Sequence, residues 1–324
     1  MKNRTENNVL VTVICMTYNH ERYIRQCLES LVSQITDFSY EIIVHDDAST
    51  DNTANIVREF EKKYPHLIRP VYQTVNQFHR VQEVYADLLS MAKGKYIADC
   101  EGDDFWTSVY KLQKQADYME SNEKCSVCAH AAYYAAEDGT LQEGTYFRPY
   151  DESKVVPIED ILNNWRFATN SLFYHKAAKD EGIIPYQQDC QNGDYATIVY
   201  LALKGEVYYI DELMSAYRVV SIGSLNWVAQ EDLDKFYVAR SRYIEMIKRI
   251  DEYTKGKYHT ILKSYRDNVS FEMHLTMGHI REVRKYEEKF RKLTYKQKIK
   301  LYIQGYFPKC YNVLRNIKRR FRRI

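Results

Sequence analysis

Apolar runs and amphipathic stretches alternate along the first third of the chain. Short β-rich apolar runs before polar turns predict buried strands, and apolar residues three or four apart predict helices. The predicted strands are Val9–Met16, Tyr40–His45, Ile68–Gln73 and Lys95–Cys100. The helices between them carry Ile24, Cys27, Leu28 and Leu31, then Ile56, Val57 and Phe60, then Val81, Val84, Tyr85, Leu88 and Leu89 before Gly94. This alternation predicts an α/β fold with a mainly parallel central sheet flanked by helices.

The pattern becomes less regular after residue 120. We predict strands near 126–134, 167–174, 207–210 and 214–218 and a helix near 194–204. Beyond about residue 230 the sequence is helical and charged, with apolar residues on one side and lysines on the other. We therefore expect one domain over residues 1–225 and a C-terminal helical extension over 226–324.

Composition is that of an ordinary folded protein. The 324 residues are 45% hydrophobic and 28% charged, which excludes the disordered and fibrous classes. No apolar run is long enough to span a membrane and the first residues are polar, so we expect a cytoplasmic protein. The seven cysteines lie in apolar surroundings and predict reduced core thiols. Cys125 and Cys128 form a CxxC pair without a second pair, which is weak evidence for a metal site.

Charge is distributed unevenly along the chain. Residues 281–324 contain 16 Lys/Arg and 3 Asp/Glu, a net charge of +13, so the remainder carries −11. One face of the predicted last helix collects apolar side chains: Cys310, Val313, Leu314, Ile317 and Phe321. A basic amphipathic helix favours binding to an anionic membrane surface, at about 1 kcal/mol per Lys or Arg. A solvated helix or one that forms a homo-oligomer is the alternative, and no nucleic-acid motif is present.

An acidic turn follows the fourth predicted strand. Glu101, Asp103 and Asp104 place three carboxylates beside Gly102, and such a cluster favours a hard divalent cation such as Mn²⁺ or Mg²⁺. A solvated turn that caps the next helix is the alternative. Because ligands bind beyond the carboxyl ends of parallel strands, this turn should meet the polar loops Thr17–His20 and Asp46–Asp51.

Five segments together resemble the family 2 glycosyltransferases, which have the glycosyltransferase-A fold. They are VTVICMTYNHERYIRQCLESLVSQ, EIIVHDDASTDNT, YIADCEGDDFW, KLQKQ and NGDYATIVYLALKGEVYYIDELMSAYRV, and they cover about residues 9–220. The resemblance implies a nucleotide-sugar-binding half over about 1–120 and an acceptor half over 121–225. It also implies an enzyme that transfers a sugar from a nucleotide diphosphate to an acceptor hydroxyl.

The resemblance implies roles for residues of the first two loops. Thr17, Tyr18 and Asn19 would line the nucleotide pocket. Asp46 or Asp47 would accept a hydrogen bond from the base, typically uracil.

The resemblance gives the acidic turn to the metal and the diphosphate. Asp103 matches the family's metal-binding aspartate, with Glu101 and Asp104 beside it. Glu101 replaces an aspartate that is common in the family. The metal would bridge the diphosphate and offset charge as the sugar leaves.

Asp194 falls where the family places its catalytic base, which takes the proton of the attacking hydroxyl and gives inversion at the anomeric carbon. From the residues alone an aspartate at the first turn of a helix is ordinarily a cap. Asp189 is a nearby competitor. Val220 stands where many relatives carry a histidine ligand.

The sequence thus predicts a metal-dependent inverting glycosyltransferase, with a UDP-sugar donor and a saccharide or lipid-linked saccharide acceptor. Cell-surface polysaccharide or lipopolysaccharide synthesis at the inner face of the membrane is the expected setting. The alternatives are a catalytically inactive sugar-nucleotide-binding protein or scaffold and, less favoured, a nucleotidyltransferase. The latter would normally need a Gly-rich phosphate loop, which the chain lacks.

Overall fold

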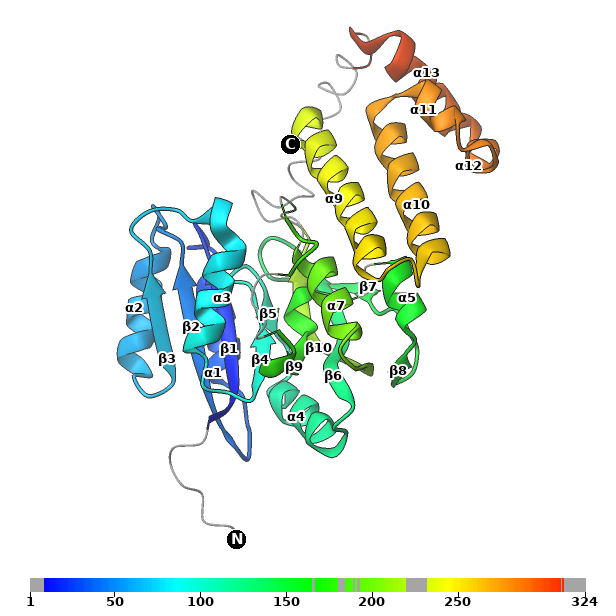
Figure 1. Ribbon diagram of the computed structural model, residues 1–324. Coiled ribbons are helices and arrows are strands. Elements are labelled where there is room, and N and C mark those ends of the chain that lie inside the picture. The colour runs from blue at the N-terminus through cyan, green and yellow to red at the C-terminus, as the bar shows by residue number, and fades with distance from the viewer. Residues whose placement is uncertain are drawn as a thin grey trace. The chain divides into compact units, whose positions relative to one another are not determined.

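A computed structural model describes residues 9–164, 167–179, 184–188, 190, 193–219, 232–309 and 311. The chain divides into two compact units, residues 1–224 and 225–324. The described part of the first unit contains a ten-stranded sheet in the order β3-β2-β1-β4-β9-β6-β10-β5, with β7 on β6 and β8 on β10 (Figure 1). The predicted α/β fold class is therefore confirmed.

Four parallel strands form the first half of the sheet. They are β1 (Val9–Thr17), β2 (Ser39–Asp46), β3 (Ile68–Tyr72) and β4 (Tyr96–Asp99). β1 lies between β2 and β4, and β3 lies outside β2. The central strands are buried along nearly their whole length, as expected for parallel strands covered on both faces.

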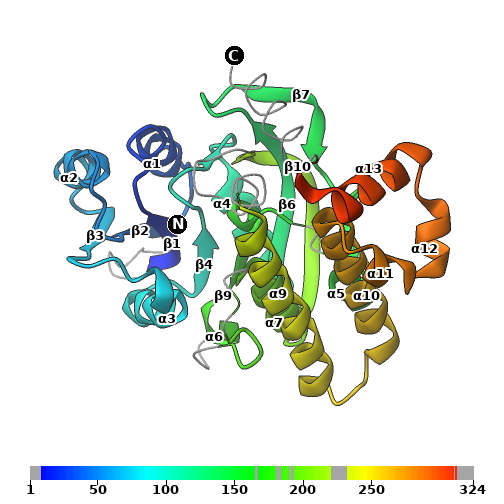
Figure 2. The same ribbon diagram turned by 90° about the horizontal axis from the view of Figure 1, so that it is seen from above.

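Helices cover both faces of this half. The connecting helices are α1 (Ile24–Val32), α2 (Thr53–Lys63), the short 3-10 helix η1 (Phe78–Arg80) and α3 (Val81–Met91). α1 and α2 lie on one face and α3 lies on the other (Figure 2). Leu28 and Phe60 share one core cluster with Leu112 of α4 (Lys111–Ser121). One continuous apolar core therefore lies under α1, α2 and α4.

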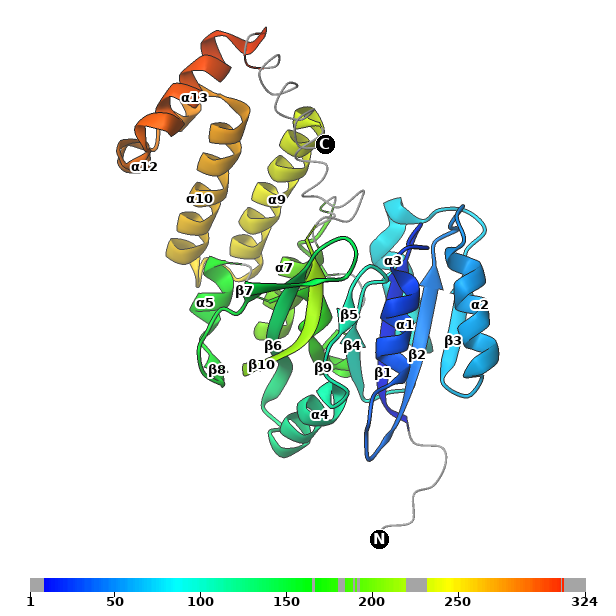
Figure 3. The same cartoon turned by 180° about the vertical axis from the view of Figure 1, so that it is seen from behind.

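The second half of the sheet is mixed in direction. Its strands are β5 (Phe105–Trp106), β6 (Cys125–Ala135), β7 (Leu141–Phe147), β8 (Lys154–Val156), β9 (Phe173–His175) and β10 (Glu206–Arg218). β6 and β10 are parallel and lie side by side (Figure 3), whereas β9 is antiparallel to both β4 and β6. The short helices are α5 (Ile158–Asn163), η2 (Thr169–Ser171) and α6 (Lys176–Lys179), and α7 (Gly193–Ala202) is longer. The parallel order predicted for the first half does not continue here.

Two predicted elements differ from the structure. The strand predicted near 167–174 starts only at Phe173, because η2 occupies Thr169–Ser171. The two strands predicted near 207–210 and 214–218 are one strand, β10, whose register against β6 shifts between Ile210 and Ser215. An irregular register of this kind breaks the two-residue alternation that sequence reasoning depends on.

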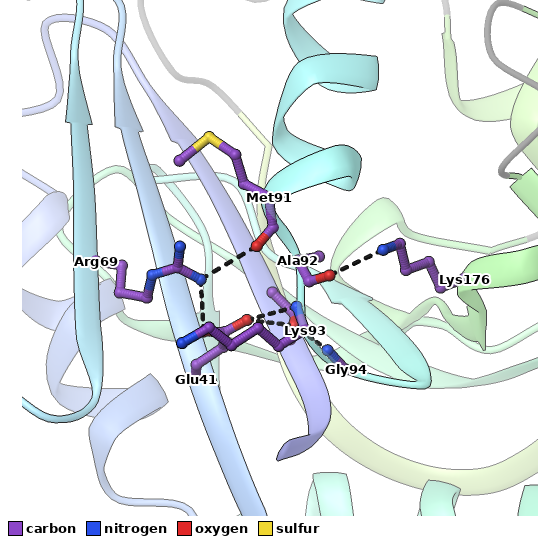
Figure 4. Close-up of polar contacts among 8 residues, drawn as sticks. Glu41, Arg69, Met91, Ala92, Lys93, Gly94 and Lys176 are labelled. Carbon is purple, nitrogen blue, oxygen red and sulfur yellow. Dashed lines mark hydrogen bonds and ion pairs between the residues drawn. The ribbon is translucent and has the colours of Figure 1, made fainter. Parts of the chain in front are cut away.

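A polar cluster links the N-terminal ends of the strands, at the edge of the sheet opposite the three polar loops. Glu41 accepts hydrogen bonds from the Lys93 backbone N–H (2.8 Å) and Arg69 Nη1 (2.7 Å) (Figure 4). It also accepts one from Thr12 Oγ1 (2.9 Å). Burial alone would raise the pKa of Glu41, but these donors lower it below its usual value. Gly94 donates to Thr12 Oγ1 (2.9 Å), and a Cβ at Gly94 would lie 2.4 Å from the Thr12 nitrogen. The cluster therefore locks β1, β2 and the α3–β4 turn together.

The second unit is helical in its described part. Its helices are α9 (Leu233–Tyr253), α10 (His259–Met277), α11 (Ile280–Arg284), α12 (Glu287–Lys292) and α13 (Tyr295–Tyr306). α9 begins at the cap Asp232, and α10 ends at Gly278, which has a φ of 76°. α10, α11 and α13 pack around a small core that contains Phe271, Val283 and Leu301. Among the described helices, none has a long enough apolar stretch to cross a bilayer.

Candidate active site

The three polar loops predicted to converge are brought together by the strand order. β1 pairs with both β2 and β4, so the loops after these strands are neighbours. The Asp47 N–H donates to the Thr17 carbonyl (3.0 Å), and the Gly102 N–H donates to the Met16 carbonyl (2.8 Å). The predicted nucleotide-binding and acidic segments therefore share one edge of the sheet.

Asn19 joins the first loop to the second. Its backbone adopts a left-handed conformation (φ 54°), which asparagine tolerates better than most residues. Its side-chain carbonyl accepts from the Thr50 N–H (2.8 Å), and its own N–H donates to Ser49 Oγ (2.9 Å). Tyr18 beside it is exposed. Asn19 thus fixes the loop and leaves the Tyr18 ring open to a ligand.

The buried polar groups under these loops are incompletely paired. Among the described residues, Thr17 Oγ1 and Asp46 Oδ1 are buried and have no hydrogen-bond partner. Asp47 is also buried, and its Oδ1 accepts from the Gln77 N–H (2.7 Å). Because an unpaired buried polar atom costs about 1–3 kcal/mol, this corner is suited to a ligand that supplies the missing partners. Asp46 has the free oxygen that the predicted base contact requires.

The three carboxylates of the acidic turn differ in their exposure to solvent. Glu101 is exposed, Asp103 is half-buried and Asp104 is buried. A Cβ at Gly102 would lie 2.6 Å from Thr17 Oγ1, so glycine allows the turn to sit directly on the first loop. Loss of water around its carboxylate and the negative charges of Asp194 and Asp103 raise the pKa of Glu101 well above its usual value. A cation bound here would relieve that repulsion.

Asp104 has a supporting position. Its Oδ2 accepts from Asn170 Nδ2 (2.8 Å) and its Oδ1 accepts from the Arg218 N–H (2.9 Å). Asn170 is itself fixed by Ser215 Oγ, which donates to its Oδ1 (2.6 Å). Both oxygens of Asp104 therefore have protein partners, and the predicted contact of Asp104 with the donor stays a prediction.

Arg218 braces the acidic turn from β10, a role that sequence reasoning missed. Its Nε donates to the Asp103 carbonyl (2.7 Å) and its Nη1 to the Ala136 and Glu137 carbonyls (3.0 and 2.8 Å). Nη2 donates to Gln26 Oε1 (2.9 Å), and the guanidinium lies over the rings of Tyr23 and Phe105. The planar fork of donors that arginine offers is used on several partners at once.

Asp194 and Glu101 line the same cavity. Asp194 lies in the first turn of α7, and the cavity, of about 160 Å³, is bounded by α3, the end of β4 and α7. Burial and the charge of Asp99 raise the pKa of Asp194, while a hydrogen bond with Thr169 and the charge of Lys179 oppose that shift. A partly enclosed carboxylate of raised pKa is suited to accept a proton.

A cluster of buried polar side chains extends from this cavity into the core. No sequence motif predicted it. The Tyr85 hydroxyl donates to Asp99 Oδ1 and shares a hydrogen bond with the Tyr174 hydroxyl. Lys179 Nζ lies 4.0 Å from the centre of the Tyr85 ring and donates to Thr197 Oγ1 (3.3 Å). Burial lowers the pKa of Lys179 to about 8, against the opposing charges of Asp99 and Asp194. Lys179 is thus the buried cation of the cavity wall.

The donor set of the acidic turn fits a hard cation only in part. Among the described residues, the Glu101 and Asp103 carboxylates have no hydrogen-bond partner like those that hold both oxygens of Asp104. In the part of the chain that the structure describes, no three His, Cys, Asp or Glu side chains form a ready metal-binding group. Two carboxylates need further oxygen ligands, which a diphosphate would supply.

Several predicted residues lie outside the described ranges. They are the competitor Asp189, the position Val220 and the basic apolar helix expected beyond Cys310. These predictions stay as they stand.

Sequence comparison identifies the family. The model of glycosyl transferase family 2 matches residues 12–180, just over half of the chain, so the protein belongs to this family. An uncharacterized protein of Mycobacterium tuberculosis is 33% identical over 71% of this chain and 64% of its own length. The putative teichuronic acid biosynthesis glycosyltransferase TuaG of Bacillus subtilis is 30% identical over 68% of this chain and 84% of its own. The chain thus spans less than two thirds of the first of these relatives.

Solved structures share the fold at low identity. The mannosyltransferase PcManGT of Pyrobaculum calidifontis, in complex with GDP-Man and Mn²⁺, has a TM-score of 0.58 at 16% identity and covers 96% of this chain and 84% of its own. Residues 1–349 of TarS from S. aureus give 0.55 at 18% identity over 92% and 79%. These neighbours confirm the predicted glycosyltransferase fold.

Proposed function

We propose that the first unit transfers a sugar from a nucleotide diphosphate-sugar to an acceptor hydroxyl with inversion. The observation that carries the proposal is the cavity that Asp194 and Glu101 share beside the nucleotide-binding loops. Residues 1–120 supply the donor loops, and 121–225 supply Asp194 and the acceptor side. TarS has been solved in complex with UDP and UDP-GlcNAc, which favours a UDP-sugar as the first donor to test.

The residues divide the chemistry as follows. The acceptor oxygen attacks the anomeric carbon, the bond from that carbon to the diphosphate breaks, and Asp194 takes the acceptor's proton. Glu101 and Asp103 would hold Mn²⁺ or Mg²⁺, which offsets charge on the departing diphosphate. Asp46 or Asp47 recognises the base, and Thr17, Tyr18 and Asn19 line its pocket. Arg218 and Asp104 keep the acidic turn in place.

The setting is proposed on the same basis. TuaG is named for teichuronic acid biosynthesis, which supports a saccharide or lipid-linked saccharide acceptor in cell-surface polysaccharide synthesis. Such an acceptor fits a position at the inner face of the membrane, where the basic C-terminal residues would meet anionic lipid.

Nucleotide release from UDP-, GDP- and dTDP-sugars tests the function. We expect one donor to give turnover that requires Mn²⁺ or Mg²⁺ and is lost on chelation. Nucleotide binding without turnover, even with membrane extract as acceptor, would favour the inactive binding protein. Release of pyrophosphate from a nucleoside triphosphate and a sugar phosphate would identify a nucleotidyltransferase.

Removal of the Lys179 charge is expected to move the pH profile of turnover. Lys179 lowers the pKa of Asp194, so Lys179→Met raises that pKa further. Because a base must be unprotonated, the acidic limb of kcat should move to higher pH. Lys179→Arg keeps the charge and should leave the limb in place. An unchanged limb in Lys179→Met would contradict the role assigned to Asp194.

A further inference from the structure

The helix α13 is held firmly by its inner face. It begins with a capping box in which Thr294 and Gln297 exchange hydrogen bonds between side chain and backbone. Leu301 packs into the core of the second unit, and Gln304 Nε2 donates to the Thr276 carbonyl (2.6 Å). Gly305 lies against Ile280, where a Cβ would be 2.6 Å from a side-chain carbon. The orientation of the helix about its own axis in this unit is therefore fixed.

Its outer face carries a stripe of large apolar side chains. Tyr295, Ile299, Tyr302 and Tyr306 follow one another at spacings of four, three and four residues, which places them on one side of the helix. Tyr295 is 79% exposed, Ile299 41% and Tyr306 65%, and the adjacent Phe307 is 62% exposed. The rings of Tyr302 and Tyr306 are stacked, with centroids 6.1 Å apart. We call Tyr295, Ile299, Tyr306 and Phe307 the α13 stripe; Tyr302 lies at its edge and packs against the core of the second unit.

The sequence segment that carries the α13 stripe is strongly basic. Residues 291–309 contain six Lys/Arg and no Asp/Glu: Arg291, Lys292, Lys296, Lys298, Lys300 and Lys309. Helical spacing puts Lys298 on one flank of the stripe and Lys296 on the other. No ion pair among the described residues involves Lys296, Lys298 or Lys300. Lys298 Nζ donates to the Arg291 carbonyl (3.2 Å), so the charges of Lys296 and Lys300 are the ones most available to an outside partner.

Charge and side-chain type select the partner. Two copies of this chain meeting through the stripe would bring lysines of the same sign together, which opposes a dimer. Tyrosine and isoleucine flanked by lysines are typical of helices that lie in a membrane interface, where the rings sit at the headgroup level and lysines meet anionic lipid. We propose that the α13 stripe is a docking surface for an anionic lipid bilayer. This proposal does not depend on the transferase activity, nor on the basic residues beyond Cys310.

Vesicle sedimentation with the full chain tests the proposal. The vesicles are phosphatidylcholine alone or with about one third phosphatidylglycerol. We expect binding only to the anionic vesicles. Ile299→Ser with Tyr306→Ser keeps every charge and should lower the partition coefficient about tenfold or more, because the lost side chains no longer bury apolar surface. Lys296→Gln with Lys300→Gln should lower it by about fivefold per lysine.

The matched control lies in the same unit. Val238→Ser with Tyr253→Ser removes one aliphatic and one tyrosine side chain of similar exposure, 48% and 44%, from α9. This control should bind like the wild type, and equal thermal unfolding of all variants excludes misfolding. Wild-type binding by the Ile299/Tyr306 variant would overturn the proposal, since the basic C-terminal residues would then suffice. Absence of binding by the wild type would overturn it too, as would a dimer in sedimentation velocity that the same variant dissociates.

Discussion

Asp194→Asn should abolish turnover while donor binding persists. A positioned general base contributes typically 10²–10⁴-fold, so kcat is expected to fall by about that factor. Asparagine keeps the shape of the side chain at the first turn of α7 but cannot take a proton from the acceptor. Steady-state nucleotide release gives kcat, and titration of the nucleotide gives an affinity that should change by no more than about threefold.

Two further variants make this result specific. Asp87→Asn changes an exposed carboxylate of α3, the helix that also lines the cavity, and should leave kcat unchanged. Asp189→Asn tests the nearby competitor. Retention of more than about a tenth of kcat in Asp194→Asn, with a large loss in Asp189→Asn, would transfer the role of base to Asp189.

Arg218→Met should destabilise the protein and inactivate it together. The substitution removes the guanidinium that donates to the part-buried Asp103, Ala136 and Glu137 carbonyls, of which Ala136 keeps the Gly139 N–H as a donor. A hydrogen bond to a charged group contributes about 1.5–3 kcal/mol, so the loss of several should cost a few kcal/mol, which urea unfolding will detect as a lower midpoint. Turnover should fall even below the new midpoint, because Asp103 loses its backbone anchor.

The control for this prediction is Arg22, a second arginine that contacts Glu137. Arg22 pairs with the Glu137 side chain on the surface, so Arg22→Met should cost less than about 1 kcal/mol. Arg218→Lys cannot reproduce the fork of donors and should rescue little activity. If Arg218→Met unfolds at the wild-type urea concentration, the bracing role is wrong.

Local patterns in the sequence were enough to predict that three polar loops meet at one edge of the sheet. Thr17 and Asp46 end buried strands and Glu101 follows one, and the parallel order of those strands brings their loops together. Both the apolar period and the position of the polar turns are short-range signals. The family match confirms the family that these motifs indicated.

The residues that hold the site in place could not be predicted from such short-range signals. Asn170 and Arg218 reach Asp104 across 66 and 114 residues, and Lys179 meets Tyr85 through ring contact alone. A lone asparagine, arginine or lysine in a strand-rich segment is not distinguishable from a surface residue by its spacing. The shifted register of β10 further hid which of its residues face inward.

The bracing of the acidic turn also limits how the catalytic unit can be divided. Glu101–Asp104 belongs to the predicted donor half of the chain, yet Asn170 and Arg218, which fix Asp104, come from the predicted acceptor half. A fragment that stops near residue 120 would carry the carboxylates without the groups that aim them. Exchange of acceptor halves between relatives, as a way to alter the acceptor, would therefore have to preserve these two contacts for the donor side to keep its geometry.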